Sequence, residues 1–312
     1  MEEITGFVGR DCEVNTIIES MTAGGNVLVK GRPGVGKSAV IRRAFREARD
    51  RGAFCVLVED GNTKAMALSL LEQLHKAVGL VVPGEIIGPR LKAKARREGG
   101  LEWNDLARTL LRLPVMDAAN IIVATMHKQL VWVFVEGLEV GPQKADLFTR
   151  MIEAGLMAAA IDDSNRRTRI SKMAWRFQTM VELKPLTLEQ SEQITRNWLE
   201  QRPIRFTDGR TRERFINHVA RDSGGIPAAI RGMLETASME EEITPAKAGA
   251  FNHEAGMTYL DMTPLIVLAL VVAIAGRYIS RGMGETDMLV LSGVATALFI
   301  GLRFFMYQLK AR

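Results

Sequence analysis

Short apolar runs alternate with longer stretches of helical periodicity through the first half of the chain. The runs are four to six residues long, and helical patterns such as Ser38–Asp50 and Ala65–Val78 lie between them. This alternation is typical of buried parallel strands that are joined by helices. The pattern therefore predicts an α/β fold with a parallel sheet, whose expected strands are Asn26–Lys30, Phe54–Val58, Leu130–Val135, Met157–Ile161 and Met180–Leu183.

Helical patterns replace the alternation beyond Pro185. Thr187, with Gln190 three residues later, matches a capping box, so a helix should begin there. Further helical patterns cover Arg212–Ala220 and Pro227–Ala237, and a polar stretch follows. The expected divisions are an α/β domain over 1–185, a helical domain over 186–237, a linker over 238–257 and an apolar hairpin over 258–312.

The apolar tail contains two stretches without charge, Met262–Gly276 and Met288–Leu302. Each is long enough to cross a bilayer if the arginine that follows it, Arg277 or Arg303, lies near an interface. Both stretches are apolar on all sides, as lipid-facing helices are. The sequence predicts a transmembrane helical hairpin within 262–309. A buried soluble hairpin or an oligomerisation module is the alternative.

The amino-acid composition excludes only a few classes of protein. Of the 312 residues, 47% are hydrophobic and 25% are charged, which excludes a disordered chain. Two cysteines are too few for a disulfide framework or a four-thiolate zinc site. The formal net charge of +5 permits contact with nucleic acid or anionic lipid but requires neither.

A phosphate-binding motif lies between the first expected strand and the helix after it. The sequence Gly31–Ser38, GRPGVGKS, fits the pattern GxxxxGK[ST]. Its glycines allow backbone N–H groups to surround a phosphate, Lys37 supplies a positive charge, and the Ser38 hydroxyl can bind Mg²⁺. A glycine-rich turn with a chance Lys-Ser is the alternative. The predicted nucleotide contacts here are Arg32, Pro33, Gly34, Val35, Gly36, Lys37, Ser38 and Ala39.

An acidic residue at the end of a second strand should complete the metal site. Leu130–Val135 continues directly into Glu136, which we expect to act on the Mg²⁺ side together with Ser38. The next position is Gly137, so a second adjacent carboxylate is missing. Glu139 is the candidate base in its place, or hydrolysis is slow. An ordinary exposed acid is the alternative for both glutamates.

These motifs, together with Phe7–Glu13 (FVGRDCE), resemble those of AAA+/STAND-type P-loop ATPases of the origin-recognition and signalling branches. The resemblance covers about 6–237 and implies a RecA-like P-loop core with a small helical lid. It implies that Val8, Gly9 and Arg10 lie beside the adenine. It also implies that Pro227, in the stretch SGGIP, lies against the nucleotide.

The resemblance leaves the arginines of the site open. Ala228 stands where the AAA+ branch often has a sensor arginine, and Arg231 is a substitute or a helix-surface charge. Asp162–Asn165 lies where a polar sensor is expected. The candidates for an arginine finger, which would reach a neighbouring subunit, are Arg166, Arg167, Arg169 and Arg176.

We expect a membrane-anchored, ATP-binding protein that hydrolyses Mg-ATP as a switch or an oligomeric motor. Its expected partners are ATP or ADP, the lipid bilayer and further copies of itself. The expected location is the inner or cytoplasmic membrane, crossed twice, with the ATPase domain and both termini in the cytoplasm. The alternative is a nucleotide-gated scaffold with poor hydrolysis, whose partner is a protein or a nucleic acid. The basic run Arg90–Glu98 is a solvated helix face or a contact for such a partner.

Overall fold

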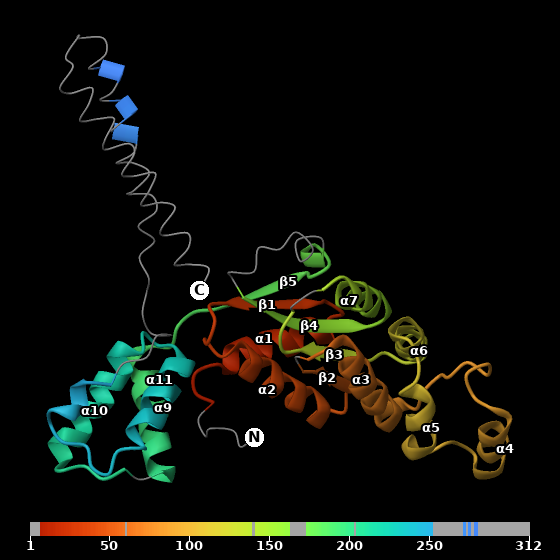
Figure 1. The fold of residues 1–312 in the computed structure, drawn as a ribbon, viewed down its shortest axis with the longest axis horizontal. Helices are drawn as coiled ribbons and strands as arrows, with labels where there is room; N and C mark the ends of the chain where they lie inside the picture. Colours follow the sequence, from red (N-terminus) through yellow and green to blue (C-terminus); the bar gives the residue numbers. More distant parts are fainter. Residues whose placement is uncertain are drawn as a thin grey trace. The chain divides into compact units, whose positions relative to one another are not determined.

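The computed structural model describes residues 7–59, 61–138, 141–162, 173–202 and 204–251, and six residues between 271 and 279. The chain forms two compact units, Met1–Met257 and Thr258–Arg312. All elements named below belong to the first unit (Figure 1).

Five parallel strands form one sheet in the order β2-β3-β4-β1-β5, which confirms the predicted α/β fold (Figure 1). Strand β1 lies between β4 and β5, and its last residue, Gly31, pairs with Asp162 on one side and with Leu183 on the other. The carboxyl ends of β1 and β4 are therefore neighbours. The strands are β1 (Val27–Gly31), β2 (Cys55–Val58), β3 (Trp132–Val135), β4 (Leu156–Asp162) and β5 (Thr179–Leu183).

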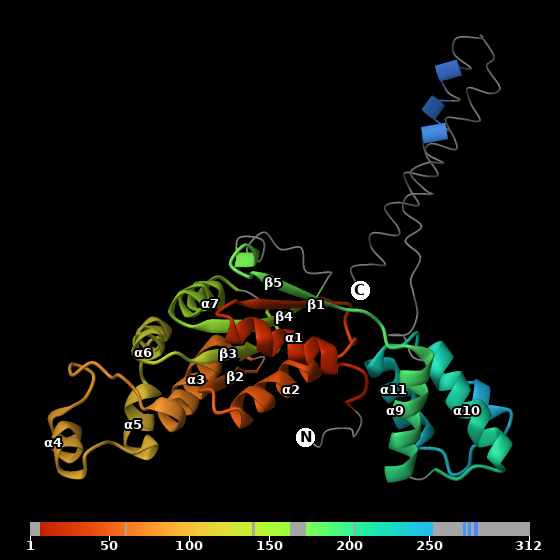
Figure 2. The same ribbon diagram turned by 180° about the vertical axis from the view of Figure 1, so that it is seen from behind.

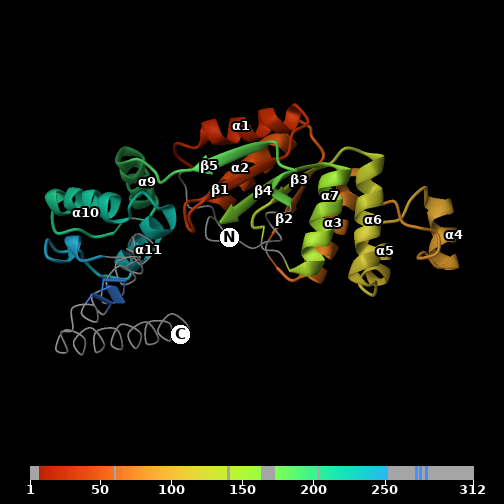
Figure 3. The same cartoon turned by 90° about the horizontal axis from the view of Figure 1, so that it is seen from above.

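Helices cover both faces of this sheet (Figure 3). Side chains of a strand alternate between its two faces. Val27 and Val29 accordingly pack in the cluster that contains α1 and α2, whereas Leu28 packs in the cluster that contains α3, α6 and α7. The bounds of the helices in this domain are α1 (Asp11–Thr22), α2 (Lys37–Asp50), α3 (Thr63–Val78), α4 (Pro89–Glu98), α5 (Trp103–Leu110), α6 (Val115–Lys128) and α7 (Pro142–Ala154).

A helical domain follows β5 with a hydrophobic core of its own, built around Trp198, Phe215 and Met233. The predicted capping box is present, because the Thr187 hydroxyl accepts from the Gln190 N–H at 3.2 Å, and Gln190 Oε1 accepts from the Thr187 N–H at 3.0 Å. The elements of this domain are α9 (Leu188–Gln201), α10 (Gly209–Asp222), α11 (Pro227–Ala237) and the 3₁₀ helix η1 (Lys247–Gly249).

Residues 238–251 differ from the linker that the sequence suggested. Ile243 and Ala248 are fully buried in the core of the helical domain. The Phe251 ring packs edge-on against Phe215, with ring centroids 5.5 Å apart. Isolated apolar residues in a polar stretch show no periodicity, so only the packing assigns them to the helical domain.

The predicted transmembrane hairpin, 262–309, lies almost entirely outside the described residues. Val271, Val272, Ile274, Tyr278 and Ile279 are described there, and their side chains are exposed. Within the described part of the chain, no helix has both the length and the apolar character needed to span a bilayer. The hairpin therefore stays a prediction.

Candidate nucleotide-binding site

The loop between β1 and α2 has the backbone geometry of an anion cradle. Gly34 and Gly36 have φ values of +77° and +99°, which residues with a Cβ rarely adopt. Gly36 is the N-cap of α2 and supplies no side-chain acceptor. Because the first N–H groups of a helix have no acceptor inside the helix, those of α2 are available to an anion.

The predicted contacts of this loop divide into exposed and buried residues. Val35 is fully buried, and its side chain packs close to the backbone of Gly31, which anchors the loop on the sheet. Five of the predicted nucleotide contacts are exposed on the surface: Arg32, Pro33, Gly34, Ser38 and Ala39. The loop therefore presents its glycine backbone and the Ser38 hydroxyl on the surface while one valine holds it in place.

The Lys37 ammonium group is buried among acceptors of the same site. Its side chain is 9% exposed and Nζ donates to the carbonyl oxygens of Gly31 at 2.9 Å and Arg32 at 2.7 Å. It also forms an ion pair with Asp162 at the end of β4. An ammonium group has three donors, so all three are used. A triphosphate must therefore replace at least one of these partners to bind Lys37.

Asp162 is the one residue of the expected polar sensor, Asp162–Asn165, that the structure describes. Its side chain is 40% exposed, and the β1–β4 register brings it opposite Gly31. Of the arginine-finger candidates, Arg176 is described. It pairs with Glu153 and lies over the Trp175 ring, 4.9 Å from its centroid. The candidates Glu139, Arg166, Arg167 and Arg169 lie outside the described residues.

The Glu136 carboxylate is directed at an arginine of α2. Arg42 donates to both carboxylate oxygens, through Nη2 at 2.7 Å and also through Nε, and the Glu136 side chain is 9% exposed. The Ser38 hydroxyl donates to the Glu136 backbone carbonyl at 3.3 Å. Ser38 and Glu136 thus lie close together, through the Glu136 backbone, and their joint role at Mg²⁺ stays a prediction. The carboxylate, however, is held in a bidentate pair that sequence reasoning missed.

The contact of Arg42 with the end of β3 could have been suspected from its spacing to Ser38 in the sequence. It follows Ser38 by four residues, so the two side chains share one face of α2. A residue in that position reaches the same strand end as the Ser38 hydroxyl. The sequence does not show that β3 ends beside that face of α2, so Glu136 could not be identified as the partner of Arg42.

The helical domain contacts the loop through the N-terminus of α11. The Ala228 N–H donates to the Gly34 carbonyl at 3.1 Å, and a Cβ on Gly34 would lie 2.8 Å from the Ala228 Cβ. A Cβ on Gly36 would lie 3.8 Å from Pro227 Cγ, so Pro227 is adjacent to the loop. Arg231 pairs instead with Glu235 on its own helix at 2.7 Å and is exposed.

The segment predicted to lie beside the adenine is held at the junction of the two domains. Arg10 is buried and donates to Glu13 at 2.9 Å and to the Lys184 carbonyl, just beyond β5. Gly9 has a φ of +70°, and a Cβ there would overlap the Gln190 side chain. Val8 is half-buried. Residues 8–10 therefore contact both the exit of the core and the start of α9.

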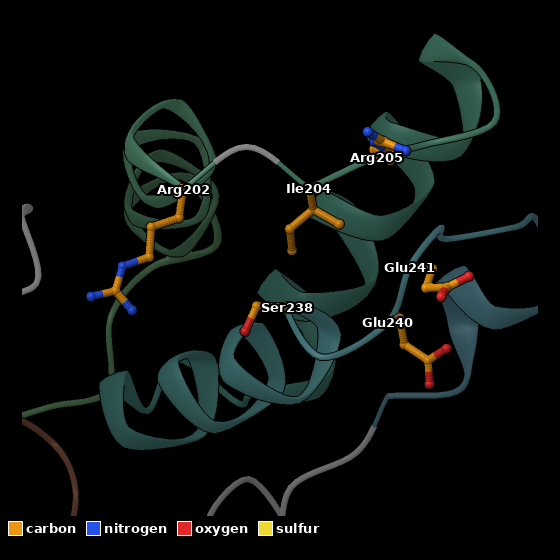
Figure 4. A pocket seen from close by; sticks show the side chains of 6 residues that line it. All are labelled: Arg202, Ile204, Arg205, Ser238, Glu240 and Glu241. Carbon is orange, nitrogen blue, oxygen red and sulfur yellow. The ribbon is translucent and has the colours of Figure 1, made fainter.

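A separate hollow of about 650 Å³ lies on the helical domain (Figure 4). Two arginines and two glutamates line it, and none of the residues predicted for nucleotide binding does. Its lining residues are Arg202, Ile204, Arg205, Ser238, Glu240 and Glu241. The phosphate loop and this hollow are therefore different places on the molecule.

Comparison with known proteins finds a match to a family model described as an AAA ATPase domain. Residues 6–124 match the family model of that description. No curated protein matches the chain. Among solved structures, the ORC2 protein of Aeropyrum pernix is similar, with 12% identity, a TM-score of 0.51 and coverage of 97% of this chain and 82% of that one.

Two further solved structures match this chain with similar sequence identity and TM-score. The ORC1 protein of Aeropyrum pernix, solved in complex with DNA, has 15% identity, a TM-score of 0.52 and coverage of 87% and 74%. Cdc6p of Pyrobaculum aerophilum has 13% identity, a TM-score of 0.52 and coverage of 87% and 76%. At these identities the likeness establishes the fold alone. The finer assignment to the STAND branch stays a prediction.

Proposed function

We propose that this protein binds Mg-ATP at the loop Gly31–Ser38 and hydrolyses it slowly. The observation that supports this most directly is the buried Lys37 ammonium group beside the uncapped N-terminus of α2. Two glycines with positive φ hold the loop in a shape that exposes backbone donors. Positive charge and backbone N–H groups at one point are what a triphosphate requires.

The oxygen atoms of Ser38 and Glu136 also suit the binding of Mg²⁺. The Ser38 hydroxyl and the Glu136 carboxylate are hard oxygen ligands, and the two residues are in contact. When bound, the ion neutralises charge on the β- and γ-phosphates. For Glu136 to contribute, its carboxylate must share or leave Arg42.

The protein's own groups supply binding and orientation. Lys37 exchanges Asp162 for phosphate oxygens, which releases the Asp162 carboxylate to accept a hydrogen bond from water. The backbone of Gly34 contacts Ala228, so movement of the loop is passed to α11. A slow turnover is expected, because Gly137 carries no carboxylate and Glu136 is occupied by Arg42.

ATP is expected to stabilise the folded protein. At 100 times the dissociation constant, a ligand that binds only the folded state adds about 2.7 kcal/mol. For a chain of this size that corresponds to a rise in Tm of about 5 °C. Thermal unfolding with and without Mg-ATP measures the shift, and phosphate release measures hydrolysis. AMP is the control, and an equal shift with AMP, or none with millimolar ATP, contradicts the proposal.

A hydrolysis-poor, nucleotide-gated scaffold is the second candidate. Its support is the same pair of features, the missing carboxylate at Gly137 and the Arg42 contact of Glu136. Its partner would be a protein or a nucleic acid. Persistent ATP binding without measurable phosphate release favours the scaffold over the ATPase. Self-association in an oligomer is part of both candidates.

The second part of the proposal is a membrane anchor formed by 262–309, with the ATPase domain and both termini in the cytoplasm. Its support is the sequence, which has two uncharged stretches joined by a short polar one. The full-length chain is expected to stay in the membrane pellet after alkaline carbonate extraction, because a spanning hairpin resists removal. Recovery of the chain in the carbonate supernatant contradicts the anchor.

A further inference from the structure

Helix α4, Pro89–Glu98, carries most of the excess positive charge of the molecule. Its five basic residues and one acidic residue give a formal charge of +4, compared with +5 for the whole chain. Every residue of α4 is described, and none is buried. The helix lies at the end of the first unit that is remote from α9–α11, as both Figure 2 and Figure 3 show.

One of the five basic residues fastens the helix to its neighbour. Lys94 Nζ lies 2.8 Å from both carboxylate oxygens of Asp105 on α5 and 3.6 Å from Glu98. The hydrogen bond that Lys94 donates to Asp105 raises the pKa of Lys94 and lowers the pKa of Asp105. Lys94 is therefore used within the protein and fixes which face of α4 is turned toward α5.

The other four basic residues are Arg90, Lys92, Arg96 and Arg97, and we call them the basic face of α4. All four side chains are exposed. In the part of the chain that the structure describes, none of them pairs with an acid. At 100° per residue they occupy an arc of about 160°, and at 1.5 Å per residue they extend over about 10 Å. The result is a group of unpaired cations on one side of α4.

We propose that the basic face of α4 binds the phosphate backbone of double-stranded nucleic acid, independently of base sequence. A duplex carries about one negative charge per 1.7 Å, or about six over the length of the basic face. Three of the four cations are arginines, whose planar guanidinium groups bind phosphate oxygens in a bidentate manner. Contacts to phosphate fix position and carry no sequence information.

The same helix is poorly suited to a lipid surface. A helix that lies in a membrane interface needs large apolar side chains on the face opposite its charges. The apolar residues of α4 are Leu91, Ala93 and Ala95, and Leu91 and Ala95 are half-buried on the protein side. Charge attracts α4 to any polyanion, but nothing on it inserts among acyl chains.

The test compares two full-length variants with equal net charge. In the first, Arg90→Gln, Lys92→Gln, Arg96→Gln and Arg97→Gln remove the basic face. In the control, four exposed arginines of α2 and α10 are replaced, by Arg43→Gln, Arg210→Gln, Arg214→Gln and Arg221→Gln. Each set takes the formal net charge from +5 to +1. Glutamine is a good helix former, so α4 should persist, which circular dichroism checks.

Binding of a 25-base-pair duplex is measured by fluorescence anisotropy between about 50 and 200 mM KCl. Loss of four phosphate contacts should flatten the slope of log K against log salt by about 3.6 and weaken binding about tenfold or more at the lowest salt. The control should keep the wild-type slope. Arg90→Lys, Arg96→Lys and Arg97→Lys together should also keep it, because the charges remain. ATP binding should be unchanged in every variant, so the result is independent of the phosphate loop.

Three outcomes overturn the proposal. Equal losses in the α4 variant and in the control would mean that only overall charge matters. An unchanged salt slope in the α4 variant would mean that the basic face makes no phosphate contacts. Loss of binding to vesicles with 30% phosphatidylserine, or to polyglutamate, while duplex binding is unaffected, would assign the face to a lipid or an acidic protein.

Discussion

Replacement of Lys37 with alanine is expected to weaken ATP binding by about 100-fold or more. A hydrogen bond to a charged group contributes about 1.5–3 kcal/mol, and Lys37 is the buried cation of the phosphate loop. The variant also removes the hydrogen bonds that Lys37 donates to the carbonyls of Gly31 and Arg32, which loosens the loop that must surround the phosphates. Isothermal calorimetry with a slowly hydrolysed ATP analogue measures the change in dissociation constant.

Two further variants separate this effect from general loss of charge. Lys64→Ala removes an exposed lysine near the start of α3 and should leave the affinity unchanged. Asp162→Asn should tighten ATP binding by about tenfold, or about 1.4 kcal/mol, because it removes the negative charge that competes with phosphate for Lys37. An ATP affinity in Lys37→Ala equal to that of the wild type would refute the assignment of the phosphate site.

Replacement of Gly225 with alanine is expected to lower the free energy of unfolding by about 3 kcal/mol or more. Gly225 has a φ of +72°, and a Cβ there would lie 2.2 Å from the Leu186 carbonyl oxygen. The Gly225 carbonyl also accepts from the Leu186 N–H at 2.8 Å, so the overlap displaces the contact between the end of β5 and the approach to α11. Positive φ alone costs about 1–3 kcal/mol, and the backbone overlap adds to it. Urea denaturation measures the loss.

Gly52→Ala is the matched control for this variant. Gly52 has a φ of +86°, and an added Cβ would meet nothing within 4 Å. It should therefore cost about 1 kcal/mol, from backbone strain alone. If the two variants lose equal stability, the close approach of Gly225 to Leu186 contributes nothing. A larger loss in Gly225→Ala should be accompanied by faster nucleotide exchange, because α11 contacts the loop through Ala228.

The sequence predicted those features that depend on near neighbours along the chain. The capping box at Thr187 and Gln190 is formed as expected, and α11 has the predicted bounds, Pro227–Ala237. The loop after β1 precedes α2 as its glycines indicated. Each of these is set by side chains within about four positions of one another, so periodicity and motif spacing are sufficient to find them.

The contacts of the site required the tertiary structure. Arg42 and Glu136 are 94 residues apart, and sequence reasoning assigned Glu136 to a metal without that partner. The pair Lys37–Asp162 depends on β4 lying beside β1, which the order of strands along the chain does not specify. Burial of Ile243 and Phe251 depends likewise on α10 being close to them.

The amino-acid sequence by itself therefore determined the α/β class, the position of the loop Gly31–Ser38, and the approximate extents of the five strands and of α2, α3 and α11, because these follow from local propensity and spacing. Only the tertiary structure decided which charged side chains of the site form ion pairs, namely Lys37 with Asp162 and Arg42 with Glu136. Ion pairs form between side chains that the order of the sheet brings together, and that order is set by the packing of the whole domain. The ion pairs of the site therefore depend on the fold, whereas the location of the site along the chain can be recognised from the sequence.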